Sequence, residues 1–515
     1  MKIPSPRWPQ LQVPQSESAF IAGNIRWTNK DLDPVPRALR KWTVISFIGY
    51  WISDCFSVAN WQLASSIIAI GLSWKESLGL VALGFFILSI VIAMNGAGFW
   101  GSYIPIISRL ILAVFWFATN CVNGGNAVVV MLGAIWPSFL KIPNSLPAGE
   151  GISTQGMVGF LLFWLLQIPF LLVHPNQLRW LFLIKSIIVP AACTAMLIWA
   201  FVQVTTPNGG DLFTQSSQLT GPTYSWAMMS SLTAVIGNYA TLSVNQADFS
   251  RYSCVSPRWH ILYVFLLPAF FTFIAFIGIA VSSAGQAKYH TDSIPWDPNV
   301  LVSLWGNRAC RFFGAFSFAL AALGLNISAN SLSAANDFAA LAPRYLTIRR
   351  GQLLCAVLAW ALVPWKILAS AGNFLNFMSA YAVFLGPIAA IMVCDFWVVK
   401  ARKYDAVALY QPRGIYRYTG GFNIHAVIAF IFGTTPSLPG LIHSVNSDIE
   451  IGVGVHPYEF GWLLGFVGSS AVYLALNWRF PYRDAKIDEA VFAVDARLGD
   501  ETVEAEHVKN DGRKG

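Results

Sequence analysis

The chain has 515 residues, of which 56% are hydrophobic and only 11% are charged, and its formal net charge is +8. Soluble globular domains carry about a quarter charged residues, so this composition excludes that class and predicts an all-α polytopic membrane protein. The basic residues are scattered between apolar stretches and form no patch with interleaved aromatics, which excludes a nucleic-acid-binding surface.

Three regions follow from the distribution of apolar residues. Residues 1–42 form a polar N-terminal arm without an apolar signal-peptide core, and we expect this arm to stay in the cytosol. Residues 43–480 form the membrane domain, and the charged segment 481–515 predicts a disordered cytosolic tail. The tail lysines are candidate acceptors for ubiquitin or contacts for trafficking machinery, although ordinary solvated lysines explain them more simply: Lys486, Lys509 and Lys514.

Apolar stretches of about 17 to 25 residues predict twelve transmembrane helices. Their ranges are 43–72, 78–94, 109–136, 157–173, 186–204, 224–244, 261–281, 312–341, 352–369, 374–399, 424–442 and 460–476. The first, third, eighth and tenth are the longest, so we expect tilt or interruption there. Lys and Arg gather in alternate loops between the spans, whereas the loops 205–223 and 444–458 contain neither residue. This distribution predicts that both termini of the chain lie in the cytosol.

Polar residues recur at helical spacing in two of these spans. In the third span Trp116 and Asn120 lie one turn apart, and an indole face beside a carboxamide can stack on and hydrogen-bond a planar polar ring. An interfacial tryptophan with a packing asparagine is the alternative. In the eighth span Asn326, Asn330 and Ser333 can share one face, directed either into a cavity or against a neighbouring helix.

Two further spans carry unusual residues. Gly237–Asn238 in the sixth span is a weak signal for an interrupted helix, the arrangement with which transporters bind solute at mid-membrane. Asp54 lies deep in the first span, where a carboxylate is costly and usually functional, so it is a candidate carrier of a coupling proton or a member of a structural ion pair. Candidate gate residues near span ends are Asp248, Arg251 and Asp337, and a simple helix-end pair explains the first two more readily.

The sequence contains no motif for catalysis or cofactor binding. Patterns such as GxSxG, HExxH and the Walker loop are absent, and the seven cysteines are widely spaced without a CxxC pair or a His–Cys cluster. We therefore expect neither an enzyme nor a metal site, and we do not expect ATP-driven transport by this chain alone.

Four segments together resemble the nucleobase:cation symporter-1 family, above all its fungal uracil, uridine and allantoin permeases. They are NKDLDPVPRALRKW (29–42), NQADFSRY (245–252), NISANSLSAANDFAALAPRYLTIRRGQ (326–352) and FLNFMSAYAVFLGPIAAIMVCDFWVVKARKYD (374–405). The resemblance implies a leucine-transporter-like core of five plus five helices in inverted repeat, with two extra helices. It also implies a plasma-membrane proton symporter that imports a nucleobase or a related small heterocycle by alternating access, with membrane lipid as its surroundings.

The resemblance also implies roles for particular residues. Carried over by position, Trp116 stacks on the ring, Asn120 bonds its edge, and Asn330 contacts it from the eighth span. Asn238 and Tyr239 are further candidates from the sixth span. Nucleobase permeases usually have glutamine where this chain has Asn120, whereas the thiamine and nicotinamide riboside carriers have asparagine. A vitamin carrier therefore stays an alternative, as does a nutrient sensor that binds without transporting.

One departure from the family bears on the coupling ion. Gly324 and Leu325 stand where the sodium-coupled hydantoin carrier has hydroxyl residues. A sodium site is therefore not expected, and the resemblance favours coupling to protons.

Overall fold

The computed structural model describes residues 12, 40–92, 103–147, 149–173, 179–204, 213, 215–245, 250–405, 408–411 and 413–491. Over these ranges the regular structure is helical, and β pairing is limited to three isolated bridges. Within the described residues, eight helices are long and apolar enough to cross a membrane, or nine if the bent pair 452–459 and 461–479 forms one span. The chain is thus an all-helical, multi-span membrane protein, as the composition predicted.

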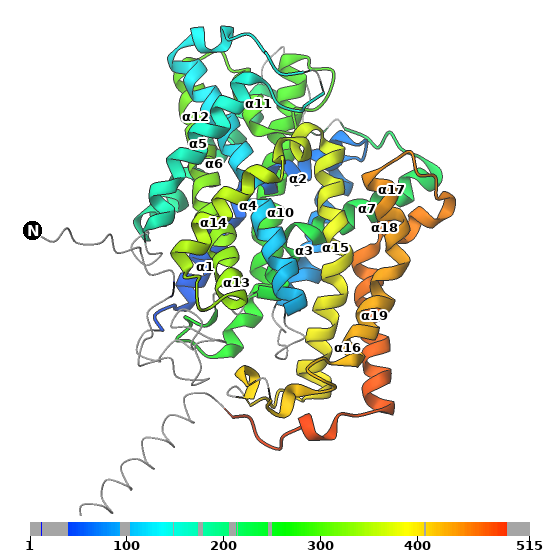
Figure 1. The fold of residues 1–515 in the computed structure, drawn as a ribbon. Helices are drawn as coiled ribbons and strands as arrows, with labels where there is room; N and C mark the ends of the chain where they lie inside the picture. Colours follow the sequence, from blue (N-terminus) through cyan, green and yellow to red (C-terminus); the bar gives the residue numbers. More distant parts are fainter. Residues whose placement is uncertain are drawn as a thin grey trace, which may run out of the picture.

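Figure 1 traces the helices in chain order. They are α1 (Val44–Cys55), α2 (Val58–Ala69), α3 (Trp74–Ile92), α4 (Tyr103–Ile135), α5 (Thr154–Leu172), α6 (Arg179–Val204), α7 (Gly221–Ala240), α8 (Leu242–Asn245), α10 (Tyr263–Tyr289), α11 (Pro298–Ser303), α12 (Arg308–Leu325), α13 (Leu332–Leu341), α14 (Ile348–Ala361), α15 (Ala371–Cys394), α16 (Ile424–Thr434), α17 (Leu438–Val445), α18 (His456–Glu459) and α19 (Gly461–Arg479).

Three of the four long spans are interrupted, as their length predicted. The first breaks at Phe56 and Ser57, where the Ser57 hydroxyl caps α2 by accepting from the Asn60 amide at 3.4 Å. The eighth contains a π-helical segment, Asn326–Ser331, and the tenth ends in another, Asp395–Val399. Such segments leave the regular hydrogen-bond ladder and often mark functional sites. The third span has no interruption, because α4 is continuous over 33 residues.

The sixth span differs from the sequence interpretation. Helix α7 runs through Gly237 and Asn238 without a break and is interrupted only at Thr241, before α8. Gly237 serves close packing instead, since a Cβ atom there would lie 2.4 Å from the carbonyl oxygen of Met378 in α15. The glycine in mid-helix therefore marks a helix contact, and the expected break lies one turn later.

The long helices pack around α4 and α15. Helix α4 contacts α5, α12 and α13, whereas α15 contacts α2, α7 and α19. Helices α16 and α19 pack on each other and on α15, at one edge of the molecule in Figure 1. Three expected spans do not combine the length and the hydropathy of the eight membrane helices. They are the first, which contains α1 and α2, the sixth, which contains α7, and the ninth, which contains α14. The total of twelve spans therefore stays a prediction.

Candidate functional site

A small central cavity lies where the break between α1 and α2 faces α4, α7 and the eighth span. Four of the five predicted substrate residues line it: Trp116, Asn238, Tyr239 and Asn330. Its volume is about 40 Å³, and a water molecule needs about 10–15 Å³ on the same measure. The cavity as it stands holds only a few waters, so a heterocyclic solute would have to displace side chains in order to bind.

Asn120, the fifth predicted substrate residue, does not line this cavity. Its side chain is fully buried, and its Nδ2 donates to the carbonyl oxygen of Trp116 at 3.1 Å. Its Oδ1 has no hydrogen-bond partner among the described residues. The contact between Asn120 and a solute stays a prediction, and it requires the amide to turn away from its own helix.

The orientation of Trp116 is fixed by α15. The indole Nε1 donates to the Tyr381 hydroxyl at 3.2 Å, and that hydroxyl donates to the Gly237 carbonyl oxygen at 2.8 Å. Phe374 and Phe377 meet the indole edge-on, with ring centroids 6.3 and 5.7 Å away. The sequence analysis did not single out Tyr381, although a tyrosine in an apolar span signals a hydroxyl that needs a partner.

Asn238 and Tyr239 also support the break in the first span. The Tyr239 hydroxyl donates to the Asp54 carbonyl oxygen at 2.9 Å, and Asn60 Nδ2 donates to the Cys55 carbonyl oxygen at 2.8 Å. Asn238 Nδ2 in turn donates to Asn60 Oδ1 at 2.7 Å. Carbonyl groups that an interrupted helix frees within a membrane need such partners. These residues therefore hold the unwound backbone at the edge of the cavity.

The asparagines of the eighth span have different roles. Asn330 lines the cavity, and its Nδ2 donates to Asn326 Oδ1 at 2.8 Å. Asn326 is fully buried, and its Nδ2 donates to the Phe117 carbonyl oxygen and to Gln167 Oε1, both at 3.1 Å. Asn326 therefore contacts neighbouring helices and positions Asn330, whereas Asn330 faces the cavity. Each of the two interpretations of this helix face holds for one of the asparagines.

Asp54 lies in a buried polar group together with a lysine that the sequence analysis overlooked. Its Oδ1 accepts from the Ser328 hydroxyl at 3.3 Å, and the carboxylate interacts electrostatically with Lys185 of α6. Lys185 is fully buried, and its Nζ has no hydrogen-bond partner among the described residues. Gly324 makes room for it, since a Cβ there would lie 2.5 Å from Lys185 Cδ. The sequence did contain a signal for Lys185, because a single lysine within an apolar stretch is usually functional.

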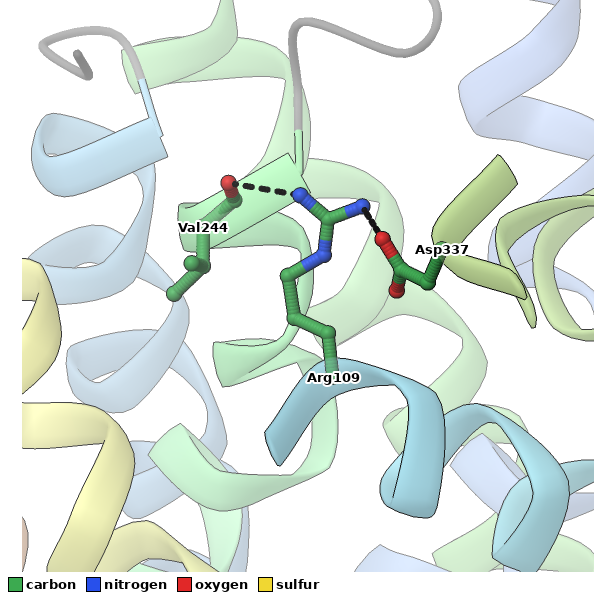
Figure 2. Close-up of polar contacts among 3 residues, drawn as sticks. All are labelled: Arg109, Val244 and Asp337. Atoms are coloured by element: carbon green, nitrogen blue, oxygen red, sulfur yellow. Dashed lines mark hydrogen bonds and ion pairs between the residues drawn. The ribbon is translucent and has the colours of Figure 1, made fainter. Parts of the chain in front are cut away.

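An ion pair stands beside the central cavity. Figure 2 shows Arg109 between Asp337 and Val244: its Nη2 lies 2.6 Å from Asp337 Oδ1, and its Nη1 donates to the Val244 carbonyl oxygen at 3.5 Å. Arg109 also lines the cavity, although its sequence position suggested only a topology signal. Asp337 was a predicted gate residue, and it pairs with this lining arginine. Its role as a gate stays a prediction.

Of the second predicted gate pair, Asp248 and Arg251, the structure describes only the arginine. Asp248 lies outside the described residues, and the Arg251 guanidinium lies over the Tyr252 ring, 5.7 Å from its centroid. Among the residues that the structure describes, no group of three or more His, Cys, Asp or Glu side chains could hold a metal ion. The chemistry that this site offers is therefore hydrogen bonding, ring stacking and charge pairing.

Comparisons with known proteins identify the family and the fold. A family model described as "Permease for cytosine/purines, uracil, thiamine, allantoin" matches residues 34–465. The allantoin permease of Saccharomyces cerevisiae is 34% identical over 492 residues, which cover 88% of this chain and 76% of the permease. The uracil permease of the same yeast is 31% identical, covering 90% and 78%. The inward-facing structure of Mhp1 superposes with a TM-score of 0.68 at 19% identity, covering 89% and 96%, and shares the fold.

Proposed function

The chain belongs to the nucleobase:cation symporter-1 family of permeases, and from this premise we propose that it imports a nucleobase or a related small heterocycle, such as uracil, uridine or allantoin, together with protons. The observation that carries the proposal is the position of Trp116 and Asn330 on one cavity, which Arg109 also lines while it pairs with Asp337. A ring can stack on the indole while the amide bonds its edge.

Transport then follows from a change in the shape of this cavity. At about 40 Å³ the cavity represents a contracted state. Solute binding stabilises an expanded state, because a ligand shifts a conformational equilibrium by its differential affinity for the two states. We propose that the Arg109–Asp337 pair beside the cavity acts as a gate, which has to open for release.

The coupling ion that we propose is the proton. The ammonium group of Lys185 lies against Gly324 and interacts with Asp54, so the protein places its own cation beside this carboxylate. A sodium ion there would meet the repulsion of a like charge in a medium of low dielectric constant. A proton on Asp54 would remove the negative partner of Lys185 and loosen the contact between α1 and α6.

We further propose the orientation in the plasma membrane that the basic connections predict. Both termini and the Arg109 end of α4 then face the cytosol. The twelve spans would comprise α1 with α2, α7 and α14 in addition to the long apolar helices. Helices α16 and α19, at the edge of the bundle, would be the two helices outside the inverted-repeat core.

Two alternatives compete with this proposal. The thiamine transporter of Saccharomyces cerevisiae is 28% identical over 92% of this chain, which keeps a vitamin carrier under consideration. The length of Asn120 was the argument for that class, and it loses weight because Asn120 lies outside the cavity. A sensor that binds solute without transport would use the same residues and is distinguished only by uptake.

The test is uptake of labelled uracil and allantoin at acidic outside pH, with and without a protonophore, in cells that lack their own carriers. Unlabelled thiamine, uridine and nicotinamide riboside serve as competitors. The wild type should show saturable uptake that the protonophore abolishes, and Asn330→Ala should abolish uptake while surface protein stays constant. Asn446→Ala, at an exposed loop position, is the matched control. Normal uptake by Asn330→Ala would refute the site.

A further inference from the structure

A second, larger cavity lies at the end of α4 that is remote from Arg109. Its volume is about 370 Å³, and its walls come from α4, the start of α5, α11 and the start of α12. Asn126, on the α4 wall, follows Trp116 by ten residues, which is about 15 Å along a helix. In the proposed orientation this cavity lies on the outer side of the central one.

A buried carboxylate contributes to its lining. Asp297 is 8% exposed and caps α11, where its Oδ1 accepts from the Asn299 backbone amide at 2.9 Å and from Asn299 Nδ2 at 3.2 Å. Its Oδ2 accepts a long bond, 3.4 Å, from Asn126 Nδ2, and the Gln62 side chain also interacts with this carboxylate. The capping role accounts for Oδ1 and leaves Oδ2 with unused capacity toward the cavity, since a carboxylate can accept about four hydrogen bonds.

Two more polar atoms of the cavity lining have no partner. Asn299 is 1% exposed, and its Oδ1 has no hydrogen bond among the described residues, while its Nδ2 also donates to the Asn123 carbonyl oxygen at 3.3 Å. Arg311 approaches from α12, and its Nε is buried without a hydrogen-bond partner in the same described set. Unpaired buried polar atoms are costly, and each such atom calls for an explanation.

A series of aromatic contacts runs from Trp296, the neighbour of Asp297, to Trp116 of the central cavity. Trp296 stacks on Phe374, with centroids 6.1 Å apart and an interplanar angle of 22°, and Phe374 in turn meets Trp116 edge-on. Trp116 lines the central cavity and not the outer one, so a solute in the outer cavity would not touch it.

We propose that the cavity at Asp297 is a second solute site, which takes a neutral cyclic imide or ureide before it reaches the central cavity. This inference rests on the proposed function. The carboxylate Oδ2 and Asn299 Oδ1 accept the N–H groups of an –NH–CO–NH– unit, and Arg311 Nε donates to its carbonyl oxygen. The volume leaves room for such a ring together with several waters.

The test counts bound solute on the purified full-length chain by equilibrium dialysis with labelled allantoin and labelled uracil. At saturating concentration we expect about two molecules per chain for the wild type, about one for Asn330→Ala, about one for Asp297→Asn and none for the double variant. Asn446→Ala, at an exposed loop position outside both cavities, is the control and should bind as the wild type does.

The outcomes separate the two proposals. If neither labelled solute binds the wild type, the proposed function fails and this inference fails with it. If the wild type binds one molecule and Asn330→Ala binds none, the outer site alone is refuted. Binding to the outer site by labelled thiamine but not by allantoin or uracil would overturn the ureide assignment.

A second measurement serves if Asn330→Ala does not fold. Ser303→Cys places a thiol at an exposed position on the cavity wall, with Cys254 and Cys310 replaced by alanine because both are exposed. Allantoin should slow its reaction with a membrane-impermeant maleimide at least about threefold, and Asp297→Asn should remove that protection. Equal reaction rates with and without allantoin and uracil would overturn the inference.

Discussion

The Tyr381 hydroxyl lies 3.2 Å from the indole nitrogen of Trp116, so α15 sets the orientation of the ring that lines the central cavity. Tyr381→Phe removes this bond and the bond to Gly237 while it preserves the aromatic volume. One lost hydrogen bond is worth about 1 kcal/mol, or roughly a fivefold change in affinity. We expect KM for uptake to rise by about that factor at constant surface expression. Tyr458→Phe, whose hydroxyl donates to the Asn376 carbonyl oxygen, is the control and should leave KM unchanged.

The Arg109–Asp337 pair gives a second prediction. The two side chains are 13% and 3% exposed, so Asp337→Ala leaves a mostly buried guanidinium without its carboxylate. Such a loss costs about 3 kcal/mol, and we expect a lower Tm and reduced uptake. The swap Arg109→Asp with Asp337→Arg should recover part of the stability. If the double variant is no more stable than the sum of the single effects predicts, the pair does not act as a unit.

The sequence predicted much of the fold because apolar length and charge placement are properties of short segments. The first span is interrupted, and the eighth and tenth contain π-helical segments, in three of the four spans whose length predicted tilt or interruption. Trp116 and Asn330 line one cavity, and the expectation that these two residues meet came from the family resemblance. Helical spacing placed Asn326 and Asn330 on the same stretch, but it could not tell which of them faces another helix.

The predictions that failed or were missed depend on contacts between distant segments. Gly237 looked like a break because a mid-helix glycine is ambiguous until the partner backbone at Met378 is known. Lys185 was missed because the fifth span was taken to begin at residue 186, and only the fold brings it to Asp54. Arg109 looked like a topology signal, and its partner is 228 residues away in sequence.

Close packing at Gly237 gives a third prediction. A Cβ atom there would lie 2.4 Å from a backbone oxygen that cannot move aside easily, so Gly237→Ala should push α7 away from α15. Overpacking typically costs about 1–3 kcal/mol, and a backbone clash falls at the upper end. Gly49→Ala is the matched control, since a Cβ at this helical glycine meets nothing within 4 Å. Equal Tm values for the two variants would argue against the close contact.

The buried charges of Asp54 and Lys185 give a fourth prediction. If Asp54 carries the coupling proton, Asp54→Asn should lower uptake at least about tenfold, and the remaining uptake should no longer rise at acidic outside pH. Lys185→Met should also remove the acid dependence, because it deletes the cation that Asp54 senses. Lys141→Met, at an exposed position, should keep it. Undiminished stimulation by acid in Asp54→Asn would assign the coupling proton to another group.

The start of the C-terminal tail contacts the loop that follows α15. This contact, which we call docking, gives a prediction about pH. The Lys400 ammonium donates to the Ala485 carbonyl oxygen and lies 5.3 and 5.4 Å from the ring centroids of Tyr416 and Tyr418. Tyr404 donates to Asp395 in the same cluster. Burial, reinforced by the charge of Asp395, raises the pKa of Tyr404 and of Tyr418.

The raised tyrosine pKa values determine how the stability of docking changes with pH. A tyrosine whose pKa is higher in the docked state stays neutral there, whereas in the released tail and loop it ionises near its ordinary value of about 10. Docking is therefore fully stable below about pH 10 and is lost as the pH rises further. A spin label at Lys486→Cys, in a background with Cys254 and Cys310 replaced by alanine, should become mobile above that pH. A label at Val453→Cys, 83% exposed in the wild type, should not change. Lys400→Met should release the tail already at neutral pH, and a label that stays immobile in this variant would refute the role of Lys400.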